Sequence, residues 1–439
     1  MKKLSNLITL SLIVFLAIFS FTSKSALADG MMIKPDPYSD RWDYSSESNQ
    51  QAFINYDNGL QKMIISVGIE DENSDGIVWL FPVPSEPNKV AIDVVKSLPQ
   101  LSGEEISEKA KSNLDNTIKF LQMTQIYPIP FMFLSQPLGV SEPVEINILG
   151  MSEDISKSVE PDVVVYEHLE KEGITSEIIT AKTATGLYDY LNNKGLKIES
   201  GSISVLDDYI GKEYSFVASW INSSENIVSA QRGVFVTFPT KNIYFPMLPT
   251  SVYGSKTIPI TIRLIGHVSP KIFQNIKSYT KTEYYIGSIS FNNDLKNFYS
   301  GPNQNIKYTK IEINAPSKFL TDDLWISNSA PLKTYYSTFF AKHSVISTIL
   351  LLIISSSITG ILVGWIFFKA LRKNIFKLGL LGLFNCLSIF GLLIATVFVR
   401  TKEKDESIRS VLTEEFVFLF SISFLIVSWL LVNLVKFTV

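Results

Sequence analysis

The sequence predicts an α+β protein in which a β-rich, two-lobed extracytoplasmic domain is followed by three transmembrane α-helices. Three observations lead to this prediction. A short basic start and an apolar stretch open the chain. A long polar region follows, in which strand and helix patterns do not alternate regularly. The C-terminal part then holds three apolar runs that contain no charged side chain.

Residues 1–28 have the parts of a secretory signal peptide. Met1-Lys2-Lys3 supplies the basic start, Leu7–Phe21 the apolar core, and Ser25-Ala26-Leu27-Ala28 the small residues of a cleavage site. The core is short for a membrane span of about 20 residues. We therefore expect cleavage after Ala28 and export of the chain from Asp29 onward.

The first predicted lobe, residues 29–151, begins with strand patterns. Two β-prone runs, Ala52–Tyr56 and Lys62–Ile69, flank the sequence Asp57-Asn58-Gly59. Asn-Gly between such runs is a strong hairpin signal. The apolar run Ile77–Phe81 predicts a further strand. The prolines after it should keep the chain extended where it leaves this strand.

One amphipathic helix is predicted in the same lobe. Ser102-Gly103-Glu104-Glu105 has the pattern of a capping box, and apolar residues follow it at helical spacing. The sequence therefore predicts a helix over 103–122.

A polar stretch, residues 152–161, separates this region from the second predicted lobe at 162–330. This lobe combines strand patterns with two short helical patterns near 185–193 and 204–210. Its strands are predicted at Val163–Tyr166, Ser176–Thr180, Tyr214–Ile221, Gly233–Phe238, Thr257–Ile265 and Tyr284–Phe291. The order of elements favours an α+β architecture over a doubly wound sheet.

A juxtamembrane segment at 331–344 leads into the predicted transmembrane helices, Val345–Phe368, Leu378–Val399 and Phe416–Val435. Each should be helical, because backbone groups in hydrocarbon must be satisfied within the segment. The loop 369–377 carries four basic residues and no acidic one, which indicates the cytoplasmic side. We expect a multi-pass cell-membrane protein with its large N-terminal domain outside and its C-terminus in the cytoplasm.

The first predicted span contains Ser356, Gly360 and Gly364, a small-xxx-small series that lets helices approach closely. Two interpretations stay open: packing among the helices of this chain, and docking of a membrane-protein partner on this first span. The three spans contain no Asp, Glu, Lys, Arg or His, so the usual mark of an ion or proton path is missing. We do not expect transport by this chain alone.

Composition narrows the classes of partner. Residues 29–343 contain 27 Lys and Arg against 37 Asp and Glu, a net charge of −10. An acidic domain disfavours nucleic acid, whose phosphates require clustered bases. The partners expected are membrane lipid and an envelope ligand of unknown chemistry. The sole cysteine, Cys386, lies in a predicted span, so the exported domain has no disulfide.

Several short segments resemble a known bacterial family. They are Ala28-Asp29-Gly30, Gln50–Ile54, Val78–Pro84, Val163–His168, Leu187–Leu191 and Ser215–Ala218. They look like domain of unknown function 2330 (DUF2330), and the resemblance covers roughly residues 29–330. It implies an exported, often membrane-anchored protein, and it supplies no activity, cofactor or catalytic residue.

Asp71-Glu72-Asn73-Ser74-Asp75-Gly76 starts like a calcium-binding loop, with oxygen ligands at positions one, three and five and glycine at six. The twelfth position, where a bidentate acid is needed, is Pro82. A polar hairpin turn is the better interpretation, and no metal site is assigned.

Among the histidines, His168 is the best candidate for a general base, with Glu170 or Glu172 nearby. A strand-end histidine without a catalytic role is the preferred interpretation. No nucleophile elbow, zinc motif or phosphate-binding glycine loop is present in the sequence. No catalytic residue and no cofactor is therefore assigned.

Trp42 is the candidate surface-binding residue, because polar residues flank it, whereas Trp79 lies in an apolar run typical of a core. The function expected is a non-enzymatic binding or assembly component of the bacterial cell envelope. Two alternatives are an envelope hydrolase with converging carboxylates and an accessory subunit of a membrane transport complex.

Overall fold

The structure is a computed structural model of the 439-residue chain. It describes residues 31–35, 42–44, 47–69, 78–125, 163–171, 174–194, 204–221, 233–292, 295–367, 374–387, 390–394, 397 and 406–439. The predicted signal peptide, the calcium-like loop at 71–76 and the polar link at 152–161 lie outside these residues. The described chain is an α+β protein, as predicted.

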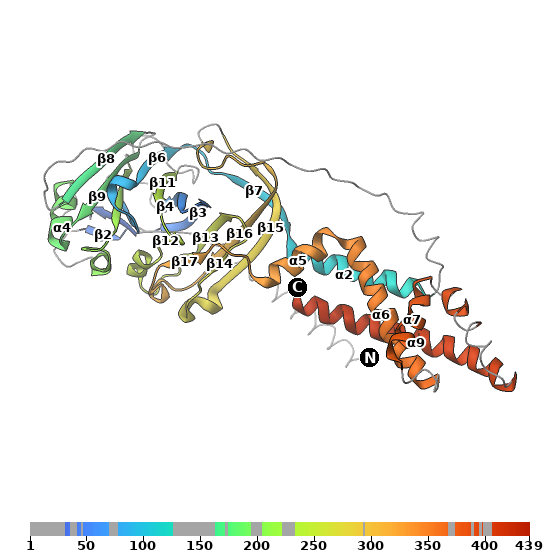
Figure 1. Cartoon of the computed structure of the whole chain (residues 1–439). Helices are drawn as coiled ribbons and strands as arrows, with labels where there is room; N and C mark the ends of the chain where they lie inside the picture. Colours follow the sequence, from blue (N-terminus) through green and yellow to red (C-terminus); the bar gives the residue numbers. More distant parts are fainter. Residues whose placement is uncertain are drawn as a thin grey trace, which may run out of the picture. The chain divides into compact units, whose positions relative to one another are not determined.

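The chain divides into two compact units, which are labelled by their elements in Figure 1. The β-rich unit comprises Met1–Ser102, Val159–Glu283 and Gly287–Ser329. The helical unit comprises Gly103–Ser158, Tyr284–Ile286 and Ala330–Val439. Each unit is therefore built from segments that are far apart in the sequence.

Three sheets make up the β structure. The six-stranded sheet has the order β2 (Trp42–Tyr44), β1 (Met31–Pro35), β5 (Val78–Val83), β10 (Ser215–Ile221), β9 (Ile174–Ala181), β8 (Val163–Lys171). The eight-stranded sheet has the order β6 (Ala91–Val95), β11 (Gly233–Pro239), β4 (Leu60–Ile69), β3 (Glu47–Asp57), β13 (Ile260–Ile265), β16 (Gln304–Ile313), β15 (Thr280–Ser290), β7 (Gln100–Glu105). A small sheet joins β12 (Ile243–Phe245), β17 (Leu324–Ser327) and β14 (Ser269–Pro270).

The predicted Asn-Gly hairpin is confirmed as β3–β4. Asn58 and Gly59 have φ values of +50° and +87°, the left-handed pair that a tight two-residue hairpin turn requires. Asp57 pairs with Leu60 directly across the turn. Local turn chemistry therefore sets the register of the two strands.

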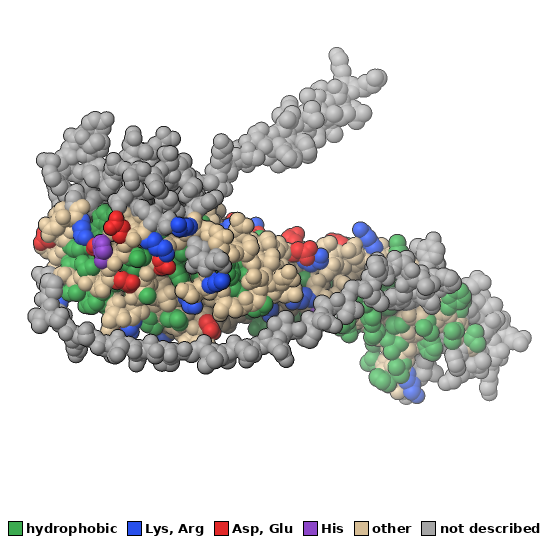
Figure 2. All heavy atoms as spheres, turned by 90° about the horizontal axis from the view of Figure 1, so that it is seen from above, with side chains coloured by type: hydrophobic (Ala, Val, Ile, Leu, Met, Phe, Trp, Pro, Cys, Tyr) green, Lys and Arg blue, Asp and Glu red, His purple; other side chains and the backbone are tan. Residues whose placement is uncertain are grey.

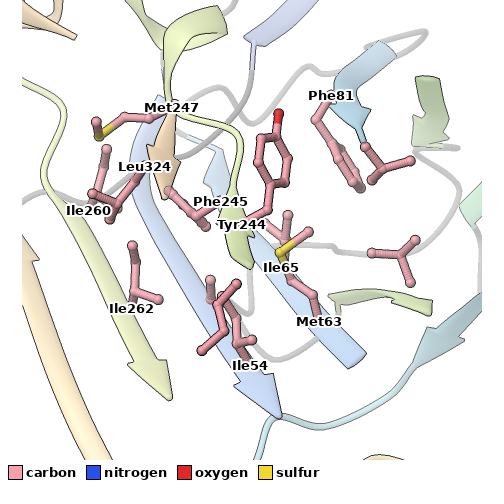
Figure 3. Close-up of a cluster of buried hydrophobic side chains, with 14 of the residues drawn as sticks. Ile54, Met63, Ile65, Phe81, Tyr244, Phe245, Met247, Ile260, Ile262 and Leu324 are labelled. Carbon is pink, nitrogen blue, oxygen red and sulfur yellow. The ribbon is translucent and has the colours of Figure 1, made fainter. Parts of the chain in front are cut away.

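The core of the β-rich unit lies on one face of β5, and a second cluster lies on its other face. Trp79 and Phe81 belong to the main core, while Val78 and Leu80 pack toward α4 (Ala184–Asn193) and its neighbours. Burial on both faces explains why this strand is apolar at every position. Figure 3 shows Phe81 near side chains of the eight-stranded sheet and of the β12 segment.

Strands of both predicted lobes interleave within these sheets. In the six-stranded sheet, β5 of the first predicted lobe pairs with β10 of the second. In the eight-stranded sheet, β3 runs parallel to β13. The boundary expected between lobes 29–151 and 162–330 therefore does not separate two bodies among the described residues. Long-range pairing of this kind leaves no signal in local periodicity.

The helical unit contains α2 (Ile106–Met123), α5 (Leu332–Lys342), α6 (Ser344–Phe367), α7 (Ile375–Leu383), the 3-10 turn η9 (Phe384–Leu387) and α9 (Glu406–Thr438). The helix predicted over 103–122 is present as α2, but it starts later than expected. Strand β7 continues to Glu105, whose carboxylate accepts from the backbone N–H groups of Ser107 and Glu108. Glu105 therefore caps the helix in place of Ser102.

Two described helices are long and apolar enough to cross a membrane, Ser344–Phe367 and Glu415–Thr438. The prediction of a third span over 378–399 is wrong for the described residues. Its first part, Ile375–Leu387, is about 20 Å long at 1.5 Å per residue, which is short of a hydrocarbon core of about 30 Å. A Cβ added at Gly391 would overlap the carbonyl oxygen of Phe384, so these two residues lie much closer together than seven positions of a continuous helix allow.

The end of α9 lies beside α5, which leads directly into α6. Ser337 Oγ donates to the backbone oxygen of Val439 at 3.1 Å. The cytoplasmic C-terminus was expected because three crossings put the two ends of the bundle on opposite faces. Two antiparallel helices instead bring residue 439 to the end of the bundle where α6 begins.

Candidate functional site

A buried carboxylate, Glu177, collects three polar side chains in the β-rich unit. The Nδ1 atom of His168 lies 2.7 Å from Glu177 Oε1, and Lys194 Nζ lies 2.6 Å from the same oxygen. The hydroxyl of Tyr190 donates to the other carboxylate oxygen. The Glu177 side chain is only 3% exposed, so these donors replace the water that a charged carboxylate needs.

Two local structures bring this cluster together. In the β8–β9 hairpin, His168 pairs directly across from Glu177. Helix α4 supplies Tyr190, and Lys194 follows four residues later at the C-cap of this helix. A spacing of four residues places both side chains on one helix face.

Aromatic rings surround the lysine of this cluster. Lys194 Nζ lies 5.0 Å from the ring centroid of Trp220 and 5.5 Å from that of Tyr190. The indole N–H of Trp220 is buried and has no hydrogen-bond partner among the described residues. The lysine is therefore held between a carboxylate and two aromatic faces.

Chemically, the His168–Glu177 pair resembles the base and orienting acid of a hydrolase. Because Nδ1 faces the carboxylate, Nε2 remains for a ligand or a proton, and the His168 side chain is 55% exposed. No hydroxyl or thiol nucleophile is hydrogen-bonded to His168 among the described residues. The cluster therefore has two elements of a catalytic triad and lacks the third.

Sequence reasoning found His168 but not its partner. Glu170 pairs across the hairpin with Thr175, and Glu172 lies outside the described residues. The available signal was the hairpin itself, because residues at equal distances from a turn face each other.

Asp323 forms a second buried node. Its oxygens accept hydrogen bonds from the hydroxyls of Tyr209 and Tyr244 and from the backbone N–H groups of Met247 and Leu248, at 2.8 to 3.0 Å. Burial raises the pKa of Asp323, and these hydrogen bonds partly oppose that rise. Four donors leave no room for a substrate on this carboxylate, so we assign it a structural role.

Asp323 also affects the pKa of three nearby tyrosines. Burial, followed by the charge of Asp323, raises the pKa of Tyr209 and of Tyr244, and it raises the pKa of Tyr214 to about 12. All three phenols therefore stay neutral at physiological pH.

A hollow of about 290 Å³ lies on the β-rich unit between Lys62, Ile92, Asp93, Phe235 and Asn297. Asp93, its one acid, forms an ion pair with Lys171 at 2.6 Å. Nearby, burial raises the pKa of Glu167, whose carboxylate accepts from the Ile92 N–H group. Among the described residues, the hollow therefore does not hold the pair of unpaired carboxylates that the hydrolase alternative requires. No group of three potential metal ligands occurs among the described residues.

Trp42, the candidate surface-binding residue, lies in β2 and pairs with Pro35 of β1. The structure describes only the backbone of this strand. Trp42 therefore stays a prediction.

The small residues of the first predicted span lie against α7 of the same chain. A Cβ added at Gly360 would lie 2.5 Å from both N and Cα of Gly382, and one at Gly364 would lie 2.9 Å from Leu378 Cδ2. Asn385 Nδ2 donates to Ser356 Oγ at 3.2 Å. An outside partner would therefore need a different face of α6.

Hydrogen bonds between buried side chains continue from Asn385 to the end of α2. Gln125 Nε2, just after α2, donates to Asn385 Oδ1 at 3.2 Å. Gln125, Asn385 and Ser356 are all buried among helices. This chain of amide and hydroxyl groups ties α2, α6 and η9 together.

No family model matches this sequence, and no curated protein matches it. Two solved structures of baculovirus p35 show a distant likeness at 11% sequence identity. One is a mutated p35 after caspase cleavage, with a TM-score of 0.20, covering 60% of this chain and 97% of that chain. The other is p35 in a complex with caspase-8, with a TM-score of 0.24, covering 64% and 97%. Scores this low carry no argument about fold or function.

Proposed function

We propose that this protein is a membrane-anchored extracytoplasmic component of the bacterial cell envelope with a binding or assembly role. The two apolar helices, the expected signal peptide and the resemblance to DUF2330 support this location. The observation that carries the assembly role is the position of α2. This helix follows directly on β7 and packs on α5, α6 and α9, so the helical unit is more than a tether.

Specific polar contacts hold α2 in place. Asn113 Nδ2 donates to the carbonyl oxygens of Phe340 and Ala341 at 2.9 and 3.0 Å. The hydroxyls of Thr117 and Thr348 lie 2.7 Å apart. Such interhelical contacts in membranes contribute about 0.6 to 2 kcal/mol each. A single span is enough to hold a domain at a surface, so a fixed additional helix favours a role in assembly.

The proposed topology keeps the large domain outside and revises the C-terminus. The basic loop at 369–377 faces the cytoplasm, α6 and α9 cross the membrane, and residue 439 returns to the outer face. Between them, the chain from Ile375 enters from the cytoplasmic side and turns back at η9. Non-helical backbone at this depth is tolerated because protein buries it, as the buried Asn385 illustrates.

Labelling of single cysteines tests this topology. Cys386 is the sole cysteine, so Cys386→Ala gives a cysteine-free background. In it, Thr438→Cys, exposed at the end of α9, should react with an impermeant maleimide on intact cells, and Lys377→Cys only after lysis. Labelling of Thr438→Cys only after lysis would contradict the outer C-terminus.

Photo-crosslinking in cells tests the assembly role. Hydrophobic side chains gather on the outer surface of the helical unit (Figure 2). A photoreactive amino acid replacing Ile354, 44% exposed on α6, should capture a membrane-protein partner. The matched control replaces Leu351, which is 4% exposed and faces the bundle. Equal results at the two positions would leave the helical unit as an anchor and place the function in the β-rich unit.

The second candidate function is an envelope hydrolase, and the His168–Glu177 pair is the observation that favours it. If a hydrolytic activity is found, His168→Ala should abolish it while the protein still folds. Glu170→Gln, on the same strand but outside the cluster, is the control. Activity that survives His168→Ala would remove this candidate.

A further inference from the structure

A polar hollow of about 620 Å³ lies within the helical unit, between α2 and the last turns of α9. Ser112, Asn116 and Lys119 line it from α2, and Asn433, Lys436 and Phe437 line it from α9. The hollow combines hydrogen-bond donors with ammonium groups on the polar exposed face of α2, beside α9, whose exposed residues are largely apolar.

The depth of this hollow follows from its neighbours. Thr117 on α2 is hydrogen-bonded to Thr348, which is five residues into α6. Lys436 is the charged residue that follows the apolar run of α9. The hollow therefore lies where both apolar helices reach the end of the hydrocarbon, at the level of lipid headgroups.

Two of the three ammonium groups of the hollow form ion pairs. Lys111 pairs with Glu108 at 3.1 Å, and Lys436 pairs with Asp115. Lys119 has no ion-pair partner among the described residues. Three ammonium groups against two carboxylates leave a net positive charge that suits a phosphate oxygen.

An apolar path leads away from the hollow. Leu430, Leu434 and Phe437 occupy one exposed face of α9 at helical spacing, and Phe437 is 89% exposed. Acyl chains can lie along such a face, whereas a free phosphate ion would make no use of it.

We propose that this hollow binds the phosphate headgroup of an anionic phospholipid in the outer leaflet, with Lys119 as its main cationic contact. The inference rests on the proposed membrane location. Lys119 reaches the phosphate by extending its aliphatic stem toward the headgroup layer. Asn116 and Ser112 supply neutral donors beside it. A bound lipid would also close the gap between α2 and α9 against water.

The test is native mass spectrometry of the full-length protein purified in detergent with added lipid. Phosphatidylglycerol should be retained, and Lys119→Ala should lower its retention about fivefold, the effect of removing one lysine near a lipid surface. Lys119→Glu should lower it further. Lys109→Ala is the matched control, because Lys109 lies on α2 and pairs with Glu104 away from the hollow.

Three comparisons decide the outcome. Phosphatidylcholine should bind more weakly than phosphatidylglycerol, and inorganic phosphate should not compete. Equal retention in the Lys119 and Lys109 variants, or competition by inorganic phosphate, would overturn the proposal. Alkaline extraction of cell membranes tests the membrane location separately, because the Lys119 variants should remain in the membrane whether or not they bind the lipid.

Discussion

The contact between α6 and α7 makes the sharpest prediction about this protein. At Gly360, a Cβ would lie 2.5 Å from two backbone atoms of Gly382 and 2.7 Å from the carbonyl oxygen of Leu378. Backbone atoms cannot rotate away, so Gly360→Ala must move the two helices apart by about 1 Å to reach ordinary contact. Overpacking of this kind costs about 1 to 3 kcal/mol.

The matched control lies on α7 itself. A Cβ at Gly379 would meet the side chain of Ile361 at 3.8 Å, an ordinary contact. Gly379→Ala should therefore leave the free energy of unfolding unchanged or raise it by up to about 1 kcal/mol, because alanine favours the helix over glycine.

Thermal unfolding in detergent is the assay. Cys386, in the turn after α7, serves as a single reporter when a thiol-reactive dye is used during heating. A cost of about 1 to 3 kcal/mol corresponds to a fall of several degrees in Tm, at about 2 to 4 °C per kcal/mol. If Gly360→Ala and Gly379→Ala melt together, the close approach of α6 and α7 is refuted.

Other predictions concern the β-rich unit and can be followed by chemical denaturation of the full chain. Asp323→Ala leaves two tyrosine hydroxyls and two backbone N–H groups without their acceptor and should cost about 3 kcal/mol or more; an unchanged midpoint would contradict the buried node. Burial raises the pKa of Asp323 above its usual value of 3.8. Between the pKa of the unfolded chain and the higher pKa of the folded protein, the folded state keeps a proton that the unfolded chain has lost. This group therefore lowers the free energy of unfolding as pH rises from the first value to the second. Asp323→Asn should therefore remove part of the pH slope, and identical slopes would refute the argument. Gly59→Ala should cost about 1 kcal/mol because φ is +87° there. Glu177→Gln should destabilise the unit more than Glu170→Gln, since Glu177 is buried with three donors.

Local features of the fold could be predicted from the sequence. The β3–β4 hairpin needs only Asn58-Gly59 between β-prone runs, and α4 needs only its apolar spacing. The strand Gln304–Ile313 was missed, although it lies between β13 and β15 in the eight-stranded sheet. Its lysines and glutamate interrupt the apolar pattern and form ion pairs such as Lys310–Glu312 at 2.6 Å.

The candidate site was only half visible in the sequence. His168 stood out as a rare residue type, but composition alone could not choose its partner among the 37 acidic residues of residues 29–343. Pairing across the hairpin selected Glu177, and α4 then brought Lys194 to the same carboxylate. These contacts join residues 9 and 17 positions apart, beyond the reach of helix or strand periodicity.

The sequence by itself determined the α+β class, the local hairpins and the two long apolar helices, because each depends on neighbouring residues or on a continuous run. Tertiary structure alone decided the partner of α2, the sharing of sheets between distant segments and the break in the second apolar run. In that run, composition was the same as in the two helices that are long and apolar enough to cross a membrane. The turn at η9 exists because Asn385 finds Ser356 and Gln125, and because Gly360 and Gly382 let two backbones meet.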